Sequence, residues 1–441
     1  MQTTLTYLES AGQGQAALRI VAPNTDARIA SHFIALIDVS ESMSDNNKLG
    51  HVKHCLSLLL KFLQPTDEIS VVSFGNESQI ILRRLRPTVD ALPVAEQKIA
   101  GLETAGCTNL SAGLASVREL LEECADSPLK PGLLILTDGH ANRGITDAGG
   151  LRTVVNRIHE LYPAVTMSFV GYGTDHNGAL LKSMAEETMG SYSLVESLEG
   201  AALTMGDALG GIISCTAQNV VIQCPVGATV EGPYTMTDGR INLGDVYAGS
   251  ETLILLNLPP GPVSIRGAAL PLLDTFEQTV AGSLDTGRNV LIELTRLRYR
   301  CADLFKKIRT AGSNLLHVTV AIQKFRDDLM DPVFVGHPIT EMLLTELQSL
   351  DAAIREATYG VNAQLQSHLL QHEAFTSLGR GTSLGIQSRP MPDAEEALNQ
   401  DPVEPLQAQN TVSYMSPTSS RARRQLAATM SALSQQGGAA Q

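Results

Sequence analysis

Five oxygen-bearing side chains stand directly after apolar segments or before helical ones, where they could hold a cation. They are Asp38, Ser40, Ser42, Thr108 and Asp138. None offers nitrogen or sulfur and only two are carboxylates, a set that suits a hard divalent cation such as Mg²⁺, with Mn²⁺ or Ca²⁺ as alternatives. Because hydroxyls carry no charge, they would neutralise the cation only in part and leave it electrophilic at an open coordination position. A carboxylate from another protein could fill that position.

The elements that must position these side chains form an alternating pattern between residues 32 and 200. Continuous apolar runs, typical of buried parallel strands, alternate with segments that repeat apolar residues at helical spacing. The predicted strands cover 32–39, 68–75, 78–85, 131–139, 164–173 and 191–197, and the predicted helices 47–63, 93–104, 110–124, 149–161, 177–189 and 199–213. This alternation predicts an α/β fold: a Rossmann-like open, mostly parallel sheet with helices on both faces. Ligands bind at the carboxyl ends of such strands, so the five side chains should meet at one edge.

The arrangement Asp38-x-Ser40-x-Ser42, with Thr108 in GCTNLSAGL and Asp138 in LTDGHANRG, resembles the metal-ion-dependent adhesion site of von Willebrand factor A domains. The resemblance implies that the two serines and the threonine ligate the metal directly. It also implies that the two aspartates act directly or through water.

The resemblance covers roughly residues 30–200, with the elements in the expected order. Two positions depart from the family pattern. Glu41 stands between the two serines, where family members often carry Gly, and Cys107 precedes the threonine, where Gly is also common. Neither change removes a ligating oxygen, but Glu41 adds negative charge near the rim of the site.

The flanking segments have a different composition and predict other folds. Short predicted strands separated by Gly, Pro and Asp occur both before and after the α/β unit, and we interpret them as one β-sandwich that receives this unit as an insertion. The alternative is that the first strands extend the α/β sheet. The predicted order is sandwich strands at 1–30, the von Willebrand factor A domain at 31–213, the β-sandwich at 214–285, a helical hairpin or bundle at 286–375, and a largely disordered tail at 376–441 with a short helix near 421–433.

Composition excludes several classes of function. The formal net charge of −14 argues against a nucleic-acid binder, since phosphate neutralisation needs a basic face. The six cysteines form no CxxC pair, which makes a zinc ribbon or RING site improbable and suggests reduced thiols. The first residues do not resemble a signal peptide, and no apolar run approaches the roughly 20 residues that span a bilayer. We therefore expect a cytoplasmic protein without a membrane span.

Two competing interpretations of the chemistry are weaker. A serine hydrolase would combine Ser40 or Ser42 with His140 and Asp138, but the chain has no GxSxG elbow around these serines. A dinucleotide loop at Gly171 is disfavoured, because the first strand should carry the glycine-rich turn and ends in DVSES instead. We expect neither catalytic residues nor an organic cofactor.

The most direct interpretation is a metal-dependent protein–protein interaction module or assembly adaptor that binds an Asp or Glu of a partner. One alternative is a structural scaffold whose metal site is only stabilising. Another is a non-catalytic adaptor subunit of a ubiquitin-type or other enzyme complex, since some plant proteins with a similar arrangement carry a RING and act in ubiquitylation. The partner's identity and the oligomeric state stay open.

Overall fold

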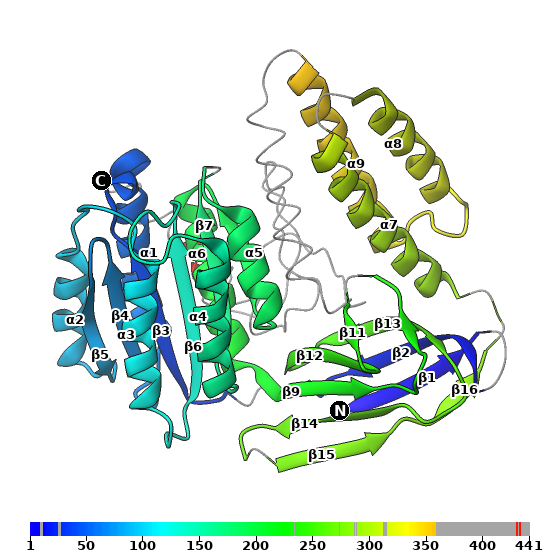
Figure 1. The fold of residues 1–441 in the computed structure, drawn as a ribbon, viewed down its shortest axis with the longest axis horizontal. Helices are drawn as coiled ribbons and strands as arrows, with labels where there is room; N and C mark the ends of the chain where they lie inside the picture. Colours follow the sequence, from blue (N-terminus) through cyan, green and yellow to red (C-terminus); the bar gives the residue numbers. More distant parts are fainter. Residues whose placement is uncertain are drawn as a thin grey trace.

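The structure is a computed structural model, and its helices and strands form three groups (Figure 1). They are a six-stranded α/β sheet, a pair of five-stranded sheets and a set of three helices between residues 290 and 358. The structure describes residues 1–8, 12–24, 28–173, 175–232, 234–272, 274–285, 287, 289–311, 315–358, 429–430 and 432–433.

The six-stranded sheet has the order β5-β4-β3-β6-β7-β8 and is parallel except for β5, which pairs antiparallel with β4 at the edge. Its strands are β3 (Ser31–Asp38), β4 (Glu68–Phe74), β5 (Ser78–Leu85), β6 (Lys130–Thr137), β7 (Thr166–Tyr172) and β8 (Ser191–Val195). Every residue of β3 and β4 is buried, because helices cover both faces. The predicted mostly parallel α/β sheet is confirmed.

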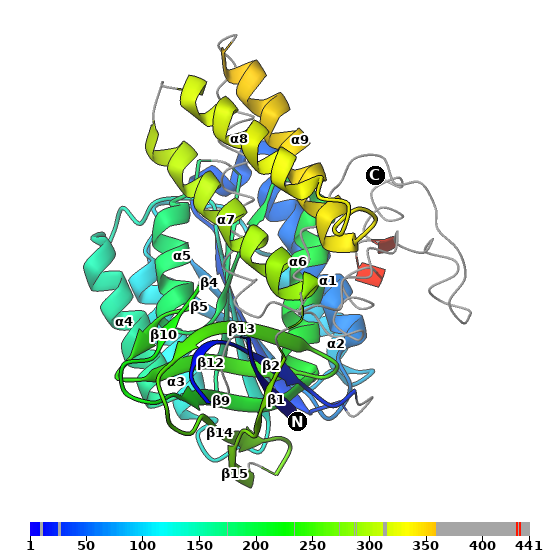
Figure 2. The ribbon, with the colours of Figure 1, turned by 90° about the vertical axis from the view of Figure 1, so that its right-hand side faces the viewer.

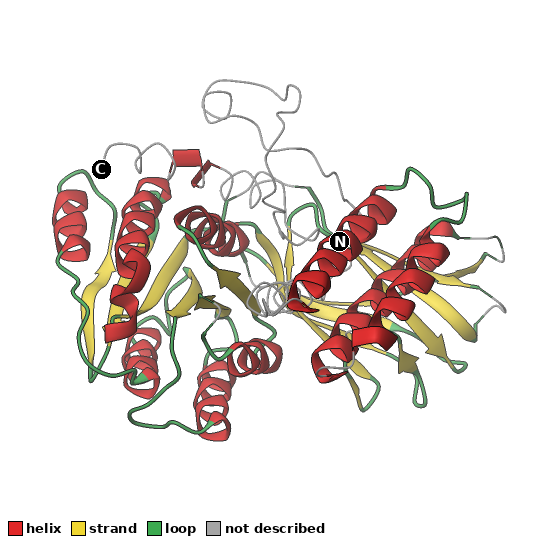
Figure 3. Cartoon of the chain, turned by 90° about the horizontal axis from the view of Figure 1, so that it is seen from above, coloured by secondary structure: helices red, strands yellow, loops and turns green. Residues whose placement is uncertain are grey.

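Three helices cover each face of this sheet and enclose two separate apolar cores (Figure 3). One face carries α1 (Lys48–Phe62), α2 (Ala91–Ala100) and α6 (Leu198–Ile213), and the other carries α3 (Leu110–Glu122), α4 (Ala148–Leu161) and α5 (Gly178–Glu187). Side-chain caps begin several of them: the Asn109 amide oxygen accepts from the Ala112 N–H at 3.1 Å, and Asp147 caps α4 in the same way. The helices therefore start where local chemistry specifies.

The strand order reverses between β3 and β6, which are neighbours in the centre of the sheet. From β3 the chain passes through a 3₁₀ segment, η1 (Glu41–Asn47), to α1 on one face, whereas from β6 it passes to α4 on the other face. Two connections that diverge from adjacent strand ends leave a crevice between them, and this is where α/β sheets bind ligands. Asp38 ends β3 and Asp138 follows β6, so both aspartates lie at this point.

The strands on either side of the α/β unit form two five-stranded sheets, with the orders β10-β13-β2-β1-β16 and β11-β12-β9-β14-β15. The strands are β1 (Gln2–Tyr7), β2 (Gly14–Val21), β9 (Cys215–Gln223), β10 (Thr229–Val230), β11 (Met236–Thr237), β12 (Arg240–Tyr247), β13 (Glu251–Leu258), β14 (Ser264–Ala269), β15 (Asp274–Thr279) and β16 (Gly282–Leu284). The two sheets share one apolar core, to which Leu18 and Ile254 contribute from one sheet and Val220 and Ile265 from the other. Because β1 and β2 pair with β16 and β13, the alternative that they extend the α/β sheet is wrong.

Polar contacts tie the α/β unit to the sheet pair. The Lys130 ammonium, at the start of β6, donates to the Ala164 carbonyl at 2.6 Å, to Gln218 at 3.0 Å and to Asp245 at 3.1 Å. The last two residues lie on β9 and β12 of the sheet pair. The Ile29 N–H also donates to the carbonyl of Ile213 at the end of α6. The buried ammonium therefore bridges both units at their junction.

The helices α7 (Val290–Ala311), α8 (Leu315–Leu329) and α9 (Pro338–Thr358) share a core of their own (Figure 2). Near the start of α7, Ile292 packs on Ala17, Leu253 and Leu255 of the sheet pair. The predicted tail lies outside the described residues except for 429–430 and 432–433, which are helical, and there Met430 is buried in the core beneath α1 and α6. Among the described residues, no helix combines the length and apolar character needed to cross a bilayer.

Candidate metal centre

Asp38 lies fully buried at the end of β3, and both of its carboxylate oxygens accept hydrogen bonds. Oδ1 accepts from the Ser40 N–H at 2.8 Å, and Oδ2 accepts from the Thr137 hydroxyl at 2.5 Å. Burial raises the pKa of Asp38 to about 6; the hydrogen bonds from Ser40 and Thr137 oppose that shift, and the charge of Asp138 adds to it. The site therefore holds a carboxylate that burial disfavours and that a nearby cation would stabilise.

Ser40, Ser42 and Asp138 form a chain of oxygen atoms at this edge of the sheet. The Ser42 hydroxyl donates to Asp138 Oδ1 at 2.7 Å and lies 3.2 Å from the Ser40 hydroxyl. In octahedral Mg²⁺ coordination, with bonds of about 2.1 Å, neighbouring ligand oxygens lie roughly 3 Å apart. The observed separations are those of hydrogen bonds and are also close to this spacing, so these three oxygens lie near enough to one another to share one cation.

Thr108 reaches the same place from the segment that opens α3. Its backbone N–H donates to the Asn142 side chain at 2.8 Å, and its carbonyl accepts from the Asn142 N–H at 3.1 Å. A Cβ added at Gly139 would lie 3.3 Å from the Thr108 hydroxyl and 3.8 Å from that of Ser42. Gly139 therefore leaves both hydroxyls uncrowded beside Asp138, and all five sequence-predicted residues converge at one edge of the sheet.

The composition of this donor set limits which ions it suits. Among the described residues, no group of three or more His, Cys, Asp or Glu side chains lies close enough together to hold a metal. A cation at this edge would therefore depend on the hydroxyls, since only two carboxylates are present. An oxygen-only set of this kind fits Mg²⁺ or Mn²⁺ better than a site built from nitrogen and sulfur would. The residues present fit a hard divalent cation.

Sequence reasoning missed Lys48, the first residue of α1. Its ammonium is buried and donates to Asp138 Oδ2 at 2.6 Å. A signal was present, because a lysine in the first turn of a helix opposes the helix dipole and needs a specific anionic partner. Thr137 and Asn142 were also missed, and their positions beside the predicted ligands emerge only from the folded backbone.

The two departures from the family pattern lie at the rim. Glu41 is exposed, and its backbone N–H donates to the Gly106 carbonyl at 3.1 Å. The Cys107 N–H donates to the Asn76 side chain at 3.0 Å. Both residues therefore hold the loops around the site through their backbones, while the predicted ligand oxygens stay in place.

The serine hydrolase interpretation gains no geometric support. Among the described residues, no hydrogen bond joins His140 to Ser40 or Ser42, and His140 is exposed. The Ser42 hydroxyl instead donates its proton to Asp138. A Ser-His-Asp triad needs a histidine within hydrogen-bonding distance of the nucleophile, and His140 does not fill that role for either serine.

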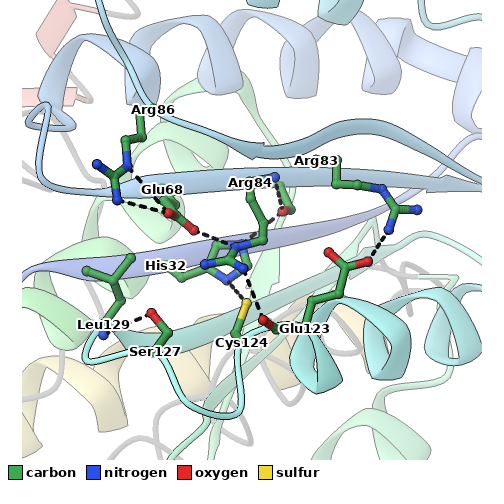
Figure 4. A network of polar contacts seen from close by, with 10 residues as sticks. His32, Glu68, Arg83, Arg84, Arg86, Glu123, Cys124, Ser127 and Leu129 are labelled. Atoms are coloured by element: carbon green, nitrogen blue, oxygen red, sulfur yellow. Dashed lines mark hydrogen bonds and ion pairs between the residues drawn. The ribbon is translucent and has the colours of Figure 1, made fainter.

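A second polar cluster lies at the opposite, amino-terminal edge of the same sheet (Figure 4). His32, on β3, contacts the Ser70 hydroxyl at 2.8 Å through Nε2 and the Cys124 sulfur at 3.1 Å through Nδ1. Burial lowers the pKa of His32 to about 4 and raises that of Cys124, which favours a neutral pair. Nearby, Glu68 is paired with Arg84 at 2.7 Å. This cluster is saturated by its own partners.

Comparison with known proteins agrees with the α/β fold. Residues 31–194 match the family model described as von Willebrand factor type A domain. The chain is similar to an uncharacterized Escherichia coli K12 protein, YfbK, with 27% identity over 248 residues, which covers 52% of this chain and 42% of the relative. It is also similar to an Arabidopsis thaliana protein named E3 ubiquitin-protein ligase WAV3, with 22% identity over 265 residues, or 56% of this chain and 33% of that one. The chain thus spans less than half the length of either relative.

A solved structure, a von Willebrand factor type A protein from Catenulispora acidiphila, superposes with a TM-score of 0.63 at 14% sequence identity. The match covers 87% of this chain and 97% of that one, which shows a shared fold. The family model, the strand order and the superposition lead to the same conclusion. Residues 31–194 of this chain match the von Willebrand factor type A domain model and have the α/β fold of that domain.

Proposed function

We propose that this protein is a metal-dependent protein-binding module, or assembly adaptor, that binds an acidic residue of a partner through a divalent cation. The hydroxyls of Ser40, Ser42 and Thr108 would ligate Mg²⁺ or Mn²⁺ directly. Asp38 and Asp138 would act directly or through water. One coordination position would remain for a carboxylate of the partner, because three uncharged hydroxyls leave the cation electrophilic.

The observation that carries this proposal is the spacing of the oxygen atoms at the reversal of strand order. Separations of 2.7 and 3.2 Å bring two hydroxyls and one carboxylate to the distances of an octahedral edge. The partly compensated burial of Asp38 supports it as well, since a cation would stabilise that carboxylate.

We propose no enzymatic activity for this site. His140 does not contact its serines, and a bound cation would use their hydroxyls as ligands. The plant relative named as a ubiquitin ligase favours one second candidate, that of a non-catalytic adaptor in a complex of that type. Both candidates require a partner, so the same binding experiment addresses them.

Direct metal binding is the first test. We expect purified protein to bind Mn²⁺ with one site per chain in calorimetry, and Ser42→Ala to weaken that binding by tenfold or more, because a ligand oxygen is lost. The matched control is Ser44→Ala, since Ser44 is an exposed serine in the same 3₁₀ segment and its hydroxyl donates to the Glu41 carbonyl. Equal Mn²⁺ affinity in both variants would contradict the assignment of these ligands.

Partner capture is the second test. The protein would be used as bait with Mg²⁺ or with EDTA, and bound proteins would be identified by mass spectrometry. We expect a partner that is retained with Mg²⁺, lost with EDTA and lost with Ser42→Ala but not with Ser44→Ala. If Mn²⁺ binds and raises the melting temperature while partner capture ignores EDTA, the metal is only stabilising and the scaffold alternative holds.

A further inference from the structure

Lys48 occupies a position that a lysine ordinarily avoids. It is the first residue of α1, where the helix dipole disfavours a cation, and it is only 5% exposed, so its ammonium has lost most of its hydration. Such a position is tolerated only where a specific anion compensates. The compensating anion is Asp138, whose Oδ2 accepts a hydrogen bond from the ammonium at 2.6 Å.

Each oxygen of the Asp138 carboxylate accepts a hydrogen bond from a different donor. Oδ2 accepts from Lys48 and Oδ1 accepts from Ser42 at 2.7 Å. A second acid, Asp175, lies 3.9 Å from the ammonium, but its side chain is 70% exposed and water competes for it. Lys48 is therefore a fixed charge of the candidate metal centre, with Asp138 as its main partner.

The charge count of the site depends on this lysine. Asp38 and Asp138 together would balance a divalent cation, so a site made only of the five predicted residues would be neutral when loaded. Lys48 adds one positive charge in direct contact with one of the two carboxylates. Unit charges a few ångströms apart, near a protein surface, interact strongly enough to change affinities by an order of magnitude.

We propose that Lys48 sets the charge balance of the metal centre, weakening its hold on the cation and strengthening its attraction for an acidic ligand. This inference rests on the metal-dependent binding proposed above. The ammonium competes with the cation for Asp138, which lowers metal affinity. Once the cation is bound, the site carries an excess positive charge, which favours an anionic ligand at the open position. Lys48 is thus a specificity-determining residue that contacts a ligand of the metal.

The test separates these two effects with Lys48→Met, Lys48→Gln and Lys48→Arg. Met and Gln both remove the charge, and Gln keeps a donor for Asp138, so it remains informative if Met fails to fold. Arg keeps the charge. The matched control is Lys61→Met, an exposed lysine in the last turn of the same helix. Mn²⁺ affinity would be measured by calorimetry, and acetate would serve as the carboxylate probe, followed by the loss of water-proton relaxation when it displaces metal-bound water.

We expect Lys48→Met and Lys48→Gln to bind Mn²⁺ about tenfold more tightly than the native protein, a gain of about 1.4 kcal/mol. In the same variants, the acetate concentration for half-displacement of water should rise severalfold. Lys48→Arg and Lys61→Met should stay near the native values in both measurements.

Other outcomes overturn the inference in distinguishable ways. Unchanged or weaker Mn²⁺ affinity in both neutral variants would show that Lys48 only positions Asp138. If Mn²⁺ binds more tightly but acetate displaces the metal-bound water at the same concentration as in the native protein, Lys48 does not strengthen the attraction for an acidic ligand. If neither the native protein nor any variant binds Mn²⁺, the metal-dependent function itself fails, and the inference fails with it.

Discussion

β3 carries a buried polar residue near each end, and the two sets of neighbours differ in how completely the charges are paired. At the amino-terminal edge, His32 is neutral and bonded on both nitrogens, while the adjacent Glu68 is held by Arg84. At the carboxyl edge, Asp38 is buried with two neutral donors and no cation of its own. Both edges belong to one sheet, so the comparison suits our proposal: the saturated cluster would contribute to stability, and the less completely paired one would bind the cation.

Buried Asp67 extends the contrast at the amino-terminal edge. Its carboxylate accepts from two nitrogens of the Arg28 guanidinium, at 2.6 and 2.9 Å, and from the backbone N–H groups of Ser31 and Gln64. With the Ser31 hydroxyl at 3.3 Å, five donors satisfy this acid, against two for Asp38. Removal of the Arg28–Asp67 ion pair at this edge should therefore lower the free energy of unfolding more than any substitution at the metal centre.

The largest expected effect is that of Arg28→Met. Removal of the guanidinium leaves the Asp67 carboxylate buried without its cation, and we expect the free energy of unfolding to fall by about 3–5 kcal/mol. Urea denaturation followed by far-ultraviolet circular dichroism would measure it. Arg83→Met is the control, since Arg83 pairs with Glu119 on the exposed surface and should have little effect. A loss no larger than that of the control would remove the contrast between the two edges.

The second largest expected effect is the loss of stability at acidic pH that His32 causes. The pKa of His32 is lowered to about 4 in the folded protein, against an ordinary value of 6.5. The unfolded chain therefore takes up a proton first, and the stability that His32 contributes above pH 6.5 is lost as the pH falls towards 4, by about 3 kcal/mol. His32→Gln should flatten this part of the pH profile of unfolding. A profile identical to that of the native protein would show that another group controls it.

The smallest effect, of opposite sign, is that of Asp38→Asn without metal. The folded pKa of Asp38 is raised to about 6, above its ordinary value of 3.8, so its contribution is full at low pH and is lost as the pH rises through 6. At pH 8, in EDTA, we expect Asp38→Asn to be more stable than the native protein by about 2 kcal/mol, after allowance for a weakened hydrogen bond. Addition of Mn²⁺ should reverse the order of melting temperatures. If the variant is less stable under both conditions, Asp38 is a structural acid like Asp67.

The sequence carried most of the information on the α/β unit, because its signals are local. Continuous apolar strands, helix caps and the turn after β3 each act within about ten residues, and the five candidate ligands lie at strand or helix ends that periodicity can locate. What could not be predicted depends on long-range neighbours. The contact of Lys48 with Asp138 spans 90 residues of sequence, and that of Thr137 with Asp38 spans 99.

The flanking strands show the same limit more strongly. The sequence predicts short strands on both sides of the α/β unit, but only the folded structure shows that β2 and β13 are partners. No strand was predicted at β15 and β16, since polar residues are common in β15 and β16 has only three residues, so both resemble a loop. Met430 is a further case: nothing in the sequence of the tail indicates that this side chain enters the core of a domain more than 200 residues earlier.

The insertion of the α/β unit between β2 and β9, which separates β2 from its partner β13, has a consequence for synthesis on the ribosome. Val21 pairs with Glu251, which is made about 230 residues later. At 5–20 residues per second, β1 and β2 wait for roughly ten to fifty seconds before their partner strand emerges. During that interval the intervening α/β unit can fold first, while β2, with its buried Leu18 and Ile20, exposes an unpaired apolar edge. β1 and β2 are thus synthesised long before β13 can pair with β2. During this delay the unpaired strand is prone to aggregation, and chaperones would protect it.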